Sequence, residues 1–135
     1  MSVLVKSVLF LSMFTLAWAS RTDVYITNSL EGKEDLHIHC KSKDDDLGPH
    51  VLHINETFKF SFRANIFYGT LFFCSFQWGN GPLLYFDVYD QKRDQNKCDQ
   101  CKCDECKWSI KKDGPCRFEP QRDCSLVRKC YEWNH

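Results

Sequence analysis

The 135-residue chain carries no net charge, because 18 lysines and arginines balance 18 aspartates and glutamates. Proteins that bind nucleic acid through its phosphates usually carry a basic excess, so this balance argues against general nucleic-acid binding. The sequence also lacks a nucleophile elbow, a zinc-protease motif and a phosphate-binding loop. We therefore predict a protein that is not an enzyme, with no catalytic residues, no metal and no cofactor.

Beyond its first residues, the chain has no apolar run long enough to cross about 30 Å of hydrocarbon. The short run from Val8 to Ala17 follows Lys6, and Ala17-Trp18-Ala19 is a small-x-small cleavage site. We predict a cleaved signal peptide at residues 1–19 and one domain at residues 20–135. The mature protein is expected to be secreted and extracellular, without membrane insertion.

No stretch of the mature sequence shows a convincing helical repeat of apolar residues. Phe58, Phe60 and Phe62 instead alternate with polar residues, which is typical of a half-buried strand. Further strands are predicted at residues 23–28, 36–41, 51–54, 70–78, 83–89 and 107–112, with a last one near residue 117. The 70–78 stretch is apolar on both sides, as central strands often are. About eight short strands separated by polar turns predict an all-β fold, a small antiparallel β-sandwich.

One segment has a biased composition. Asp90 to Cys106 is rich in Asp, Lys, Gln and Cys and contains no aliphatic residue. We predict that it forms a long exposed loop, and long loops in compact domains often carry function.

Three polar features offer metal or modification sites. Asp44, Asp45 and Asp46 suggest calcium, but neighbouring carboxylates on an extended chain point to opposite sides, so a tight turn or a partner surface is the stronger interpretation. Zinc binding by His37, His39, His50 and His53 is similarly weaker than a polar strand face. Asn55-Glu56-Thr57 is a sequon, and we predict N-glycosylation at Asn55.

No cysteine occurs before residue 40, and the chain contains nine cysteines from Cys40 onward. In an exported chain, so many cysteines predict a disulfide-stabilised domain. Cys98, Cys101, Cys103 and Cys106 form C-x2-C-x-C-x2-C, for which metal binding and redox catalysis are the weaker alternatives to disulfides.

The segment from His39 to Gly48, HCKSKDDDLG, resembles the signature of the plant self-incompatibility S-protein family. Similar segments cover most of the mature chain, at residues 24–30, 58–63, 70–76, 86–90, 103–108, 113–114 and 130–133. The resemblance implies a small secreted β-sandwich with disulfides. It also implies a signalling or recognition protein, since the best-understood member is a pistil ligand recognised by a pollen membrane receptor.

If this function holds, exposed loops on a rigid sandwich should contact an extracellular or plasma-membrane protein receptor. We expect the contact loops at residues 41–48, 65–69, 79–82 and 90–98. The predicted contact residues are Lys43, Asp44, Asp45, Asp46, Asn80, Lys92, Arg93 and Asp94. The alternative function is a secreted defence or inhibitor protein that acts on a microbial or foreign target.

The resemblance also divides the cysteines. Positions typical of the family are occupied by Cys40, Cys74, Cys103, Cys106, Cys116 and Cys130. The disulfides proposed from it are Cys40–Cys130 and Cys74–Cys106. Because nine is odd, one cysteine has no partner within the chain. We place it in the 98–106 loop or near Cys124, where it could link two chains into a disulfide-bonded dimer.

Overall fold

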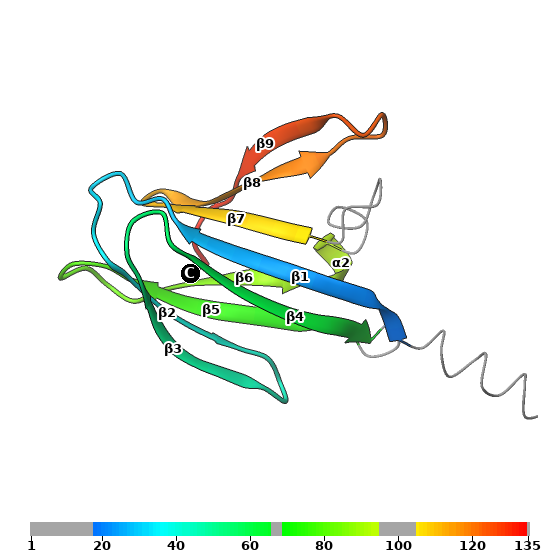
Figure 1. Cartoon of the computed structure of the whole chain (residues 1–135), viewed down its shortest axis with the longest axis horizontal. Helices are drawn as coiled ribbons and strands as arrows, with labels where there is room; N and C mark the ends of the chain where they lie inside the picture. Colours follow the sequence, from blue (N-terminus) through cyan, green and yellow to red (C-terminus); the bar gives the residue numbers. More distant parts are fainter. Residues whose placement is uncertain (1–17, 66–68, 95–104, 135) are drawn as a thin grey trace, which may run out of the picture.

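The computed structural model describes residues 18–65, 69–94 and 105–134, and these fold mainly into strands. The elements are β1 Trp18–Asn28, β2 Leu36–Lys41, β3 Asp46–Leu52, β4 Thr57–Asn65, β5 Leu71–Gln77, β6 Leu84–Asp90, α2 Gln91–Asp94, β7 Glu105–Lys111, β8 Gly114–Pro120 and β9 Leu126–Cys130. One sheet has the order β4-β1-β7-β8-β9 and the other β3-β2-β5-β6. The two sheets pack face to face (Figure 1), which confirms the predicted all-β sandwich.

The strand pairs are antiparallel except for β1 and β7, which run parallel in the described part of the chain. The regular pairing of β1 with β4 begins at Arg21, after a register shift that follows Trp18. The predicted cleavage after residue 19 would therefore leave the regular ladder of β1 intact.

Alternating apolar residues on the two sheets form the core. Val24 and Ile26 of β1, Phe76 of β5 and Trp108 of β7 are buried between the sheets. The predicted alternation on β4 is confirmed, since Phe60 is buried and lies 5.0 Å, ring centre to ring centre, from Phe72 of β5. Burial of each such large apolar side chain contributes roughly 1.5–3 kcal/mol, which makes this layer the main source of stability.

The prediction of a central strand at residues 70–78 is confirmed. The strand is interior in its sheet, between β2 and β6, and Phe72, Cys74 and Phe76 face the core. Its other face is open to solvent, however, with Leu71 and Phe73 exposed by 44% and 36%. An antiparallel sheet packs only one face on the core, so apolar residues on both sides of a strand do not require cover on both sides.

Two other strand predictions need correction. The strand expected at residues 51–54 is β3, which begins at Asp46, although Gly48 and Pro49 interrupt its apolar pattern. Gly48 has a φ of 77°, and the β2–β3 register shifts between His39 and Lys41, so the strand passes this point through an irregularity. The second correction is β9, which the sequence analysis did not expect.

The proposed disulfide pairs are wrong. Cys40 bonds to Cys74, and Cys116 bonds to Cys130. In each pair the two residues lie directly opposite one another on neighbouring strands, with Cα atoms 4.0 Å apart. Cys130 lies in the other sheet from Cys40, so the pairing proposed earlier joins positions that the strand order separates.

Candidate interaction site

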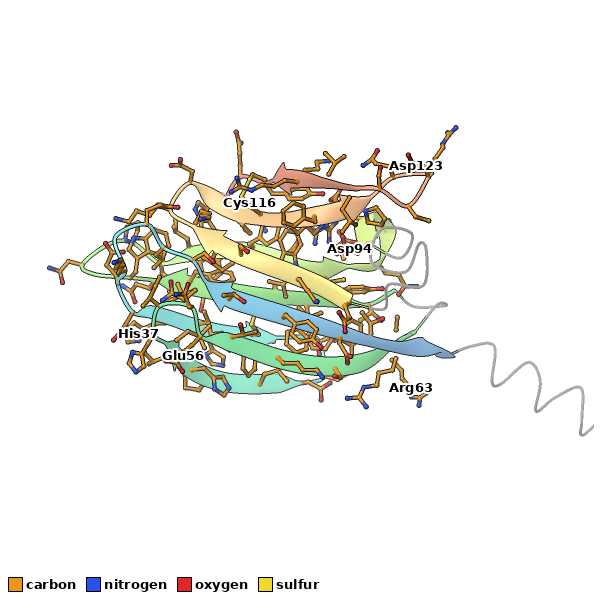
Figure 2. All side chains as sticks on the ribbon, turned by 45° about the horizontal axis from the view of Figure 1, so that its top comes forward. His37, Glu56, Arg63, Asp94, Cys116 and Asp123 are labelled. Atoms are coloured by element: carbon orange, nitrogen blue, oxygen red, sulfur yellow. A yellow bond between two sulfur atoms is a disulfide. The ribbon has the colours of Figure 1, made fainter. Side chains whose placement is uncertain are left out.

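An open groove of about 900 Å³ lies at one end of the sandwich, where the β2–β3 turn meets the start of β5 and the end of β6. Its lining residues are Ser42, Lys43, Asp44, Asp45, Phe62, Arg63, Gly69, Thr70, Leu71, Phe72, Phe73, Asp87, Asp90, Gln91 and Lys92. Figure 2 shows Arg63 at this end of the molecule and His37 and Glu56 at the other. We call this feature the loop-end groove.

The β2–β3 turn forms one wall of the loop-end groove. The Ser42 amide donates to the Asp45 carbonyl (2.8 Å), and Ser42 Oγ accepts from the Asp45 amide (3.1 Å). These bonds hold the turn closed, so the Lys43 and Asp44 side chains remain in solvent. Asp44 and Asp45 thus lie in a tight turn, as the sequence favoured, and Asp46 begins β3.

Asp46 follows this turn and is held by β2. Its Oδ1 lies 2.5 Å from His39 Nε2 and accepts from the Gly48 amide (2.9 Å). The hydrogen bond from His39, the Gly48 amide and the nearby Lys41 charge together lower the pKa of the Asp46 carboxyl. Asp46 therefore stays ionised and secures the base of the turn beside the groove.

A single helical turn, α2, forms the opposite wall. Asp90 Oδ1 accepts from the Lys92 amide (3.1 Å), and the Gln91 amide donates to the Thr70 carbonyl (3.0 Å). This arrangement exposes Lys92 on the rim, whereas Gln91 is buried. The loop expected from Asp90 to Cys106 is therefore wrong at both described ends, because residues 90–94 belong to β6 and α2 and residues 105–106 belong to β7, while residues 95–104 lie outside the described part of the chain.

The groove combines an apolar base with charges of both signs. Phe62, Leu71 and Phe72 supply the apolar surface, and Phe62 and Phe72 pack with ring centres 4.7 Å apart. Aspartates dominate one side of the rim, including Asp87, whose pKa is raised by partial burial and by the neighbouring Asp90 charge. Such a surface suits a protein partner that offers apolar and charged groups together.

The predicted contact residues divide between two ends and the interior. Lys43, Asp44, Asp45 and Lys92 line the loop-end groove, and Asp46 lies next to it. Asn80 is exposed in the β5–β6 turn, at the far end of β5 from Leu71, so it belongs to a different surface.

Asp94 is not a surface recognition residue, and that part of the prediction is wrong, whereas Arg93 is half-buried and its recognition role stays a prediction. Asp94 is fully buried at the end of α2, where it accepts from Arg93 Nε and from the Asp90 amide (2.7 and 2.8 Å). Arg117 of β8 donates to the same carboxylate at 2.7 Å. The polar composition of this segment predicts exposure, but opposite charges that meet across two elements can be buried together.

This buried ionic cluster comprises Arg93, Asp94, Arg117, Glu119 and Tyr131, three of which the sequence analysis missed. Arg117 also stacks over the Trp108 ring at 4.4 Å and bonds to Glu119 at 2.9 Å. Burial alone would lower the pKa of the Arg117 guanidinium, but Asp94 raises it above its ordinary value. Burial and the Glu119 carboxylate raise the pKa of Tyr131. The ion pair between Asp94 and Arg117 fixes α2, and hence one wall of the groove, to β8.

The other sequence candidates lie away from the groove. Asn55 is exposed in the β3–β4 turn with a φ of 68°, a conformation that asparagine tolerates better than most residues. His50 lies opposite Ile38, on the inward side, and stacks on Phe58 (4.2 Å), so it does not share the outer face of His37 and His39. Within residues 18–65, 69–94 and 105–134, no cluster of three or more metal-ligating residues forms, and no helix is long and apolar enough to cross a membrane.

Two comparisons with known proteins agree on the family. The profile of the family described as "Plant self-incompatibility protein S1" matches residues 23–133. S-protein homolog 5 of Arabidopsis thaliana is 44% identical over 113 residues, which cover 84% of this chain and 79% of the relative. S-protein homolog 2 of the same plant is 43% identical over 118 residues, covering 85% of this chain and 70% of the relative.

A solved structure shares the fold. It belongs to the SPH (self-incompatibility protein homologue) proteins, described as "a widespread family of small, highly stable, secreted proteins from plants". It superposes with a TM-score of 0.53 at 16% identity and covers 87% of this chain and 97% of its own. With the profile match over most of the chain and relatives above 40% identity, the protein belongs to the plant self-incompatibility protein S1 family.

Proposed function

We propose that this protein is a secreted, non-enzymatic ligand that binds an extracellular or plasma-membrane receptor through the loop-end groove. The observation that carries the proposal is the groove itself. It brings Lys43, Asp44 and Asp45 of one turn and Lys92 of another around an apolar base, although these residues are about fifty positions apart in sequence. Secretion is supported by the leader at residues 1–19 and by the description of the SPH proteins as secreted.

The two walls of the groove are rigidly supported, which favours specific binding. The β2–β3 turn follows directly after Cys40, whose disulfide to Cys74 joins β2 and β5. The other wall is attached to β8 through Asp94 and Arg117. Loops fixed in this way lose little conformational entropy on binding, and charges on the rim orient the partner.

The test is photo-crosslinking of the purified mature protein to isolated plant plasma membranes. The double variant Lys43→Glu, Lys92→Glu reverses two rim charges and should lower the yield of the specific crosslinked product by roughly fivefold or more. A matched control reverses Lys33, in the turn between β1 and β2, and Lys111, at the end of β7, both at the end of the sandwich away from the groove. Equal yields from wild type and the rim variant would refute the groove as the contact surface.

The non-enzymatic part of the proposal needs its own assay. Purified protein incubated with RNA should leave the RNA intact. Hydrolysis that disappears on replacing His37 or His39 would show that the protein is a nuclease instead, because acid–base cleavage of RNA depends on such side chains.

A further inference from the structure

β9 is the outer edge of the five-stranded sheet, and its five residues are all exposed. The β8–β9 hairpin rises away from β7 (Figure 1), which pairs with β8 only through Ser109 to Lys111. Leu126 and Val127 are exposed by 59% and 51%. An exposed edge strand with apolar side chains is a template for pairing with another extended segment.

The hydrogen bonds of the hairpin show which backbone groups of β9 are free. The Gln121 amide donates to the Ser125 carbonyl, and the Tyr131 amide donates to the Pro115 carbonyl, both at 2.8 Å. Bonded and non-bonded pairs alternate along an antiparallel ladder, so the bonded positions on β9 are Val127 and Lys129. The amides and carbonyls of residues 126, 128 and 130 therefore point away from β8, toward the open edge.

The side chains around this edge are apolar and cationic. Arg128 lies opposite Phe118, which is 64% exposed, and Lys129 lies 5.0 Å from the Tyr131 ring. No described carboxylate forms an ion pair with Arg128 or Lys129. The edge thus offers two cations and an apolar surface beside a row of free backbone groups.

The charge decides between a second copy of this chain and a different partner. Antiparallel pairing of two β9 strands centred on Arg128 would place this cation opposite its own copy, pairing centred on Lys129 would do the same for that residue, and like charges directly opposite one another are destabilising. A strand with carboxylates at alternate positions would meet Arg128 favourably on one face. Positive charges on an edge therefore oppose self-association while leaving the edge open to an acidic segment.

We propose that the free edge of β9 binds an extended acidic peptide segment of a partner protein, which adds to the five-stranded sheet as a sixth strand. The segment alternates acidic and apolar residues: the acidic residues lie on the face of the hairpin that carries Arg128, and the apolar residues lie on the other face, beside Val127. This surface is separate from the loop-end groove, which lies between the turns of the four-stranded sheet and α2.

The test begins with a displayed library of 12-residue peptides selected against the mature protein. We expect the enriched peptides to alternate acidic and apolar residues. A synthetic copy of one enriched peptide should slow hydrogen exchange at the amides of Leu126 and Arg128. Enrichment of peptides without acidic residues, protection elsewhere, or the absence of any enrichment would overturn the proposal.

Two variants at position 128 separate the contribution of the backbone amide from that of the side-chain charge. Arg128→Pro removes an outward amide without removing a bond to β8, and should lower the affinity for the selected peptide by about tenfold or more. Arg128→Gln keeps the amide, and should weaken binding by roughly fivefold and reduce its dependence on salt. Wild-type affinity in Arg128→Pro would overturn the proposal. So would concentration-dependent dimerisation of the wild-type chain that Arg128→Pro abolishes, because β9 would then pair with a second copy.

A control on the peptide does not depend on how the protein variant folds. In a strand that pairs along one edge, alternate amides face β9. N-methylation of one alternate set should abolish binding, and methylation of the other set should preserve it. Equal loss from both sets, or equal retention, would show that the peptide does not bind as a β-strand.

Discussion

The buried ionic cluster makes a quantitative prediction for Arg117→Met. Methionine retains much of the apolar stem over Trp108 but removes the guanidinium that reaches Asp94 and Glu119. Removing one partner from a buried ion pair typically costs about 3–5 kcal/mol, because the remaining charge stays buried without compensation. Arg93 and the Asp90 amide still bond to Asp94 in the variant. We therefore expect a loss of unfolding free energy at the lower end of this range, about 3 kcal/mol.

The measurement is urea or thermal unfolding of the mature protein, followed by tryptophan fluorescence. For a domain of this size, 3 kcal/mol corresponds to a fall in Tm of roughly 10–15 °C. Arg21→Met is the matched control, since it removes an exposed ion pair with Asp23 and should cost less than about 1 kcal/mol. A loss below about 1 kcal/mol for Arg117→Met as well would refute the role of the cluster.

A second test uses a double variant. If the cost of Arg117→Met comes from an uncompensated carboxylate, adding Asp94→Asn should restore part of the stability. The two residues are in direct contact, so their effects should not add. Strict additivity of the two changes would show instead that each side chain acts by separate packing.

Three further predictions follow from features away from the cluster. Replacing Cys40 and Cys74 with serine should cost about 4 kcal/mol from loop entropy, for a separation of 34 residues, and peptide mapping of the non-reduced protein should recover the intact pair. The hydrogen bond and charge of Asp35 raise the pKa of His53. This contact therefore stabilises the fold fully below the ordinary histidine pKa of 6.5, and the stabilisation is lost as the pH rises through the higher pKa of the folded state. The Tm difference between wild type and His53→Gln should shrink from about pH 5.5 to about pH 8.5. Asn55→Gln in a secreting plant cell should remove one glycan, seen as a faster band on a gel, and an unchanged band would contradict glycosylation at this turn.

The sequence predicted those parts of the fold that depend on local periodicity. Phe58, Phe60 and Phe62 alternate with polar residues, and this pattern alone places β4 against the core. β9 carries no such signal, because each of its residues is exposed and its position depends on pairing with β8. Edge strands of this kind are recognisable only when their neighbour is known.

Long-range pairing accounts for the remaining failures. Cysteine spacing does not reveal which strands are neighbours, so Cys40 could not be matched to Cys74 before the strand order was known. In the same way, Asp94 looked like a solvated loop residue because its partner Arg117 is 23 positions away. The turn predicted at Asp44 to Asp46 is confirmed for Asp44 and Asp45, because the hydrogen bonds that close it are local.

The cysteine count also becomes more specific. Cys106 and Cys124 are disulfide-bonded, as are Cys40, Cys74, Cys116 and Cys130. The tail near Cys124 is therefore excluded as the position of an odd thiol. That cysteine has to be sought at positions 98, 101 and 103, outside the described residues. The disulfide-linked dimer remains a proposal, and a non-reducing gel of the purified protein tests it.

The parallel pairing of β1 with β7 has a consequence for the order in which the molecule can fold. β1 lies between β4 and β7, and its Tyr25 pairs with Lys107, 82 positions later in the chain. During synthesis, one edge of β1 therefore has no native neighbour until the last quarter of the polypeptide has emerged. Contacts this distant in sequence make folding slow, commonly in milliseconds to seconds. The five-stranded sheet is therefore completed last, after the four-stranded sheet, whose strands all lie before residue 91, has emerged.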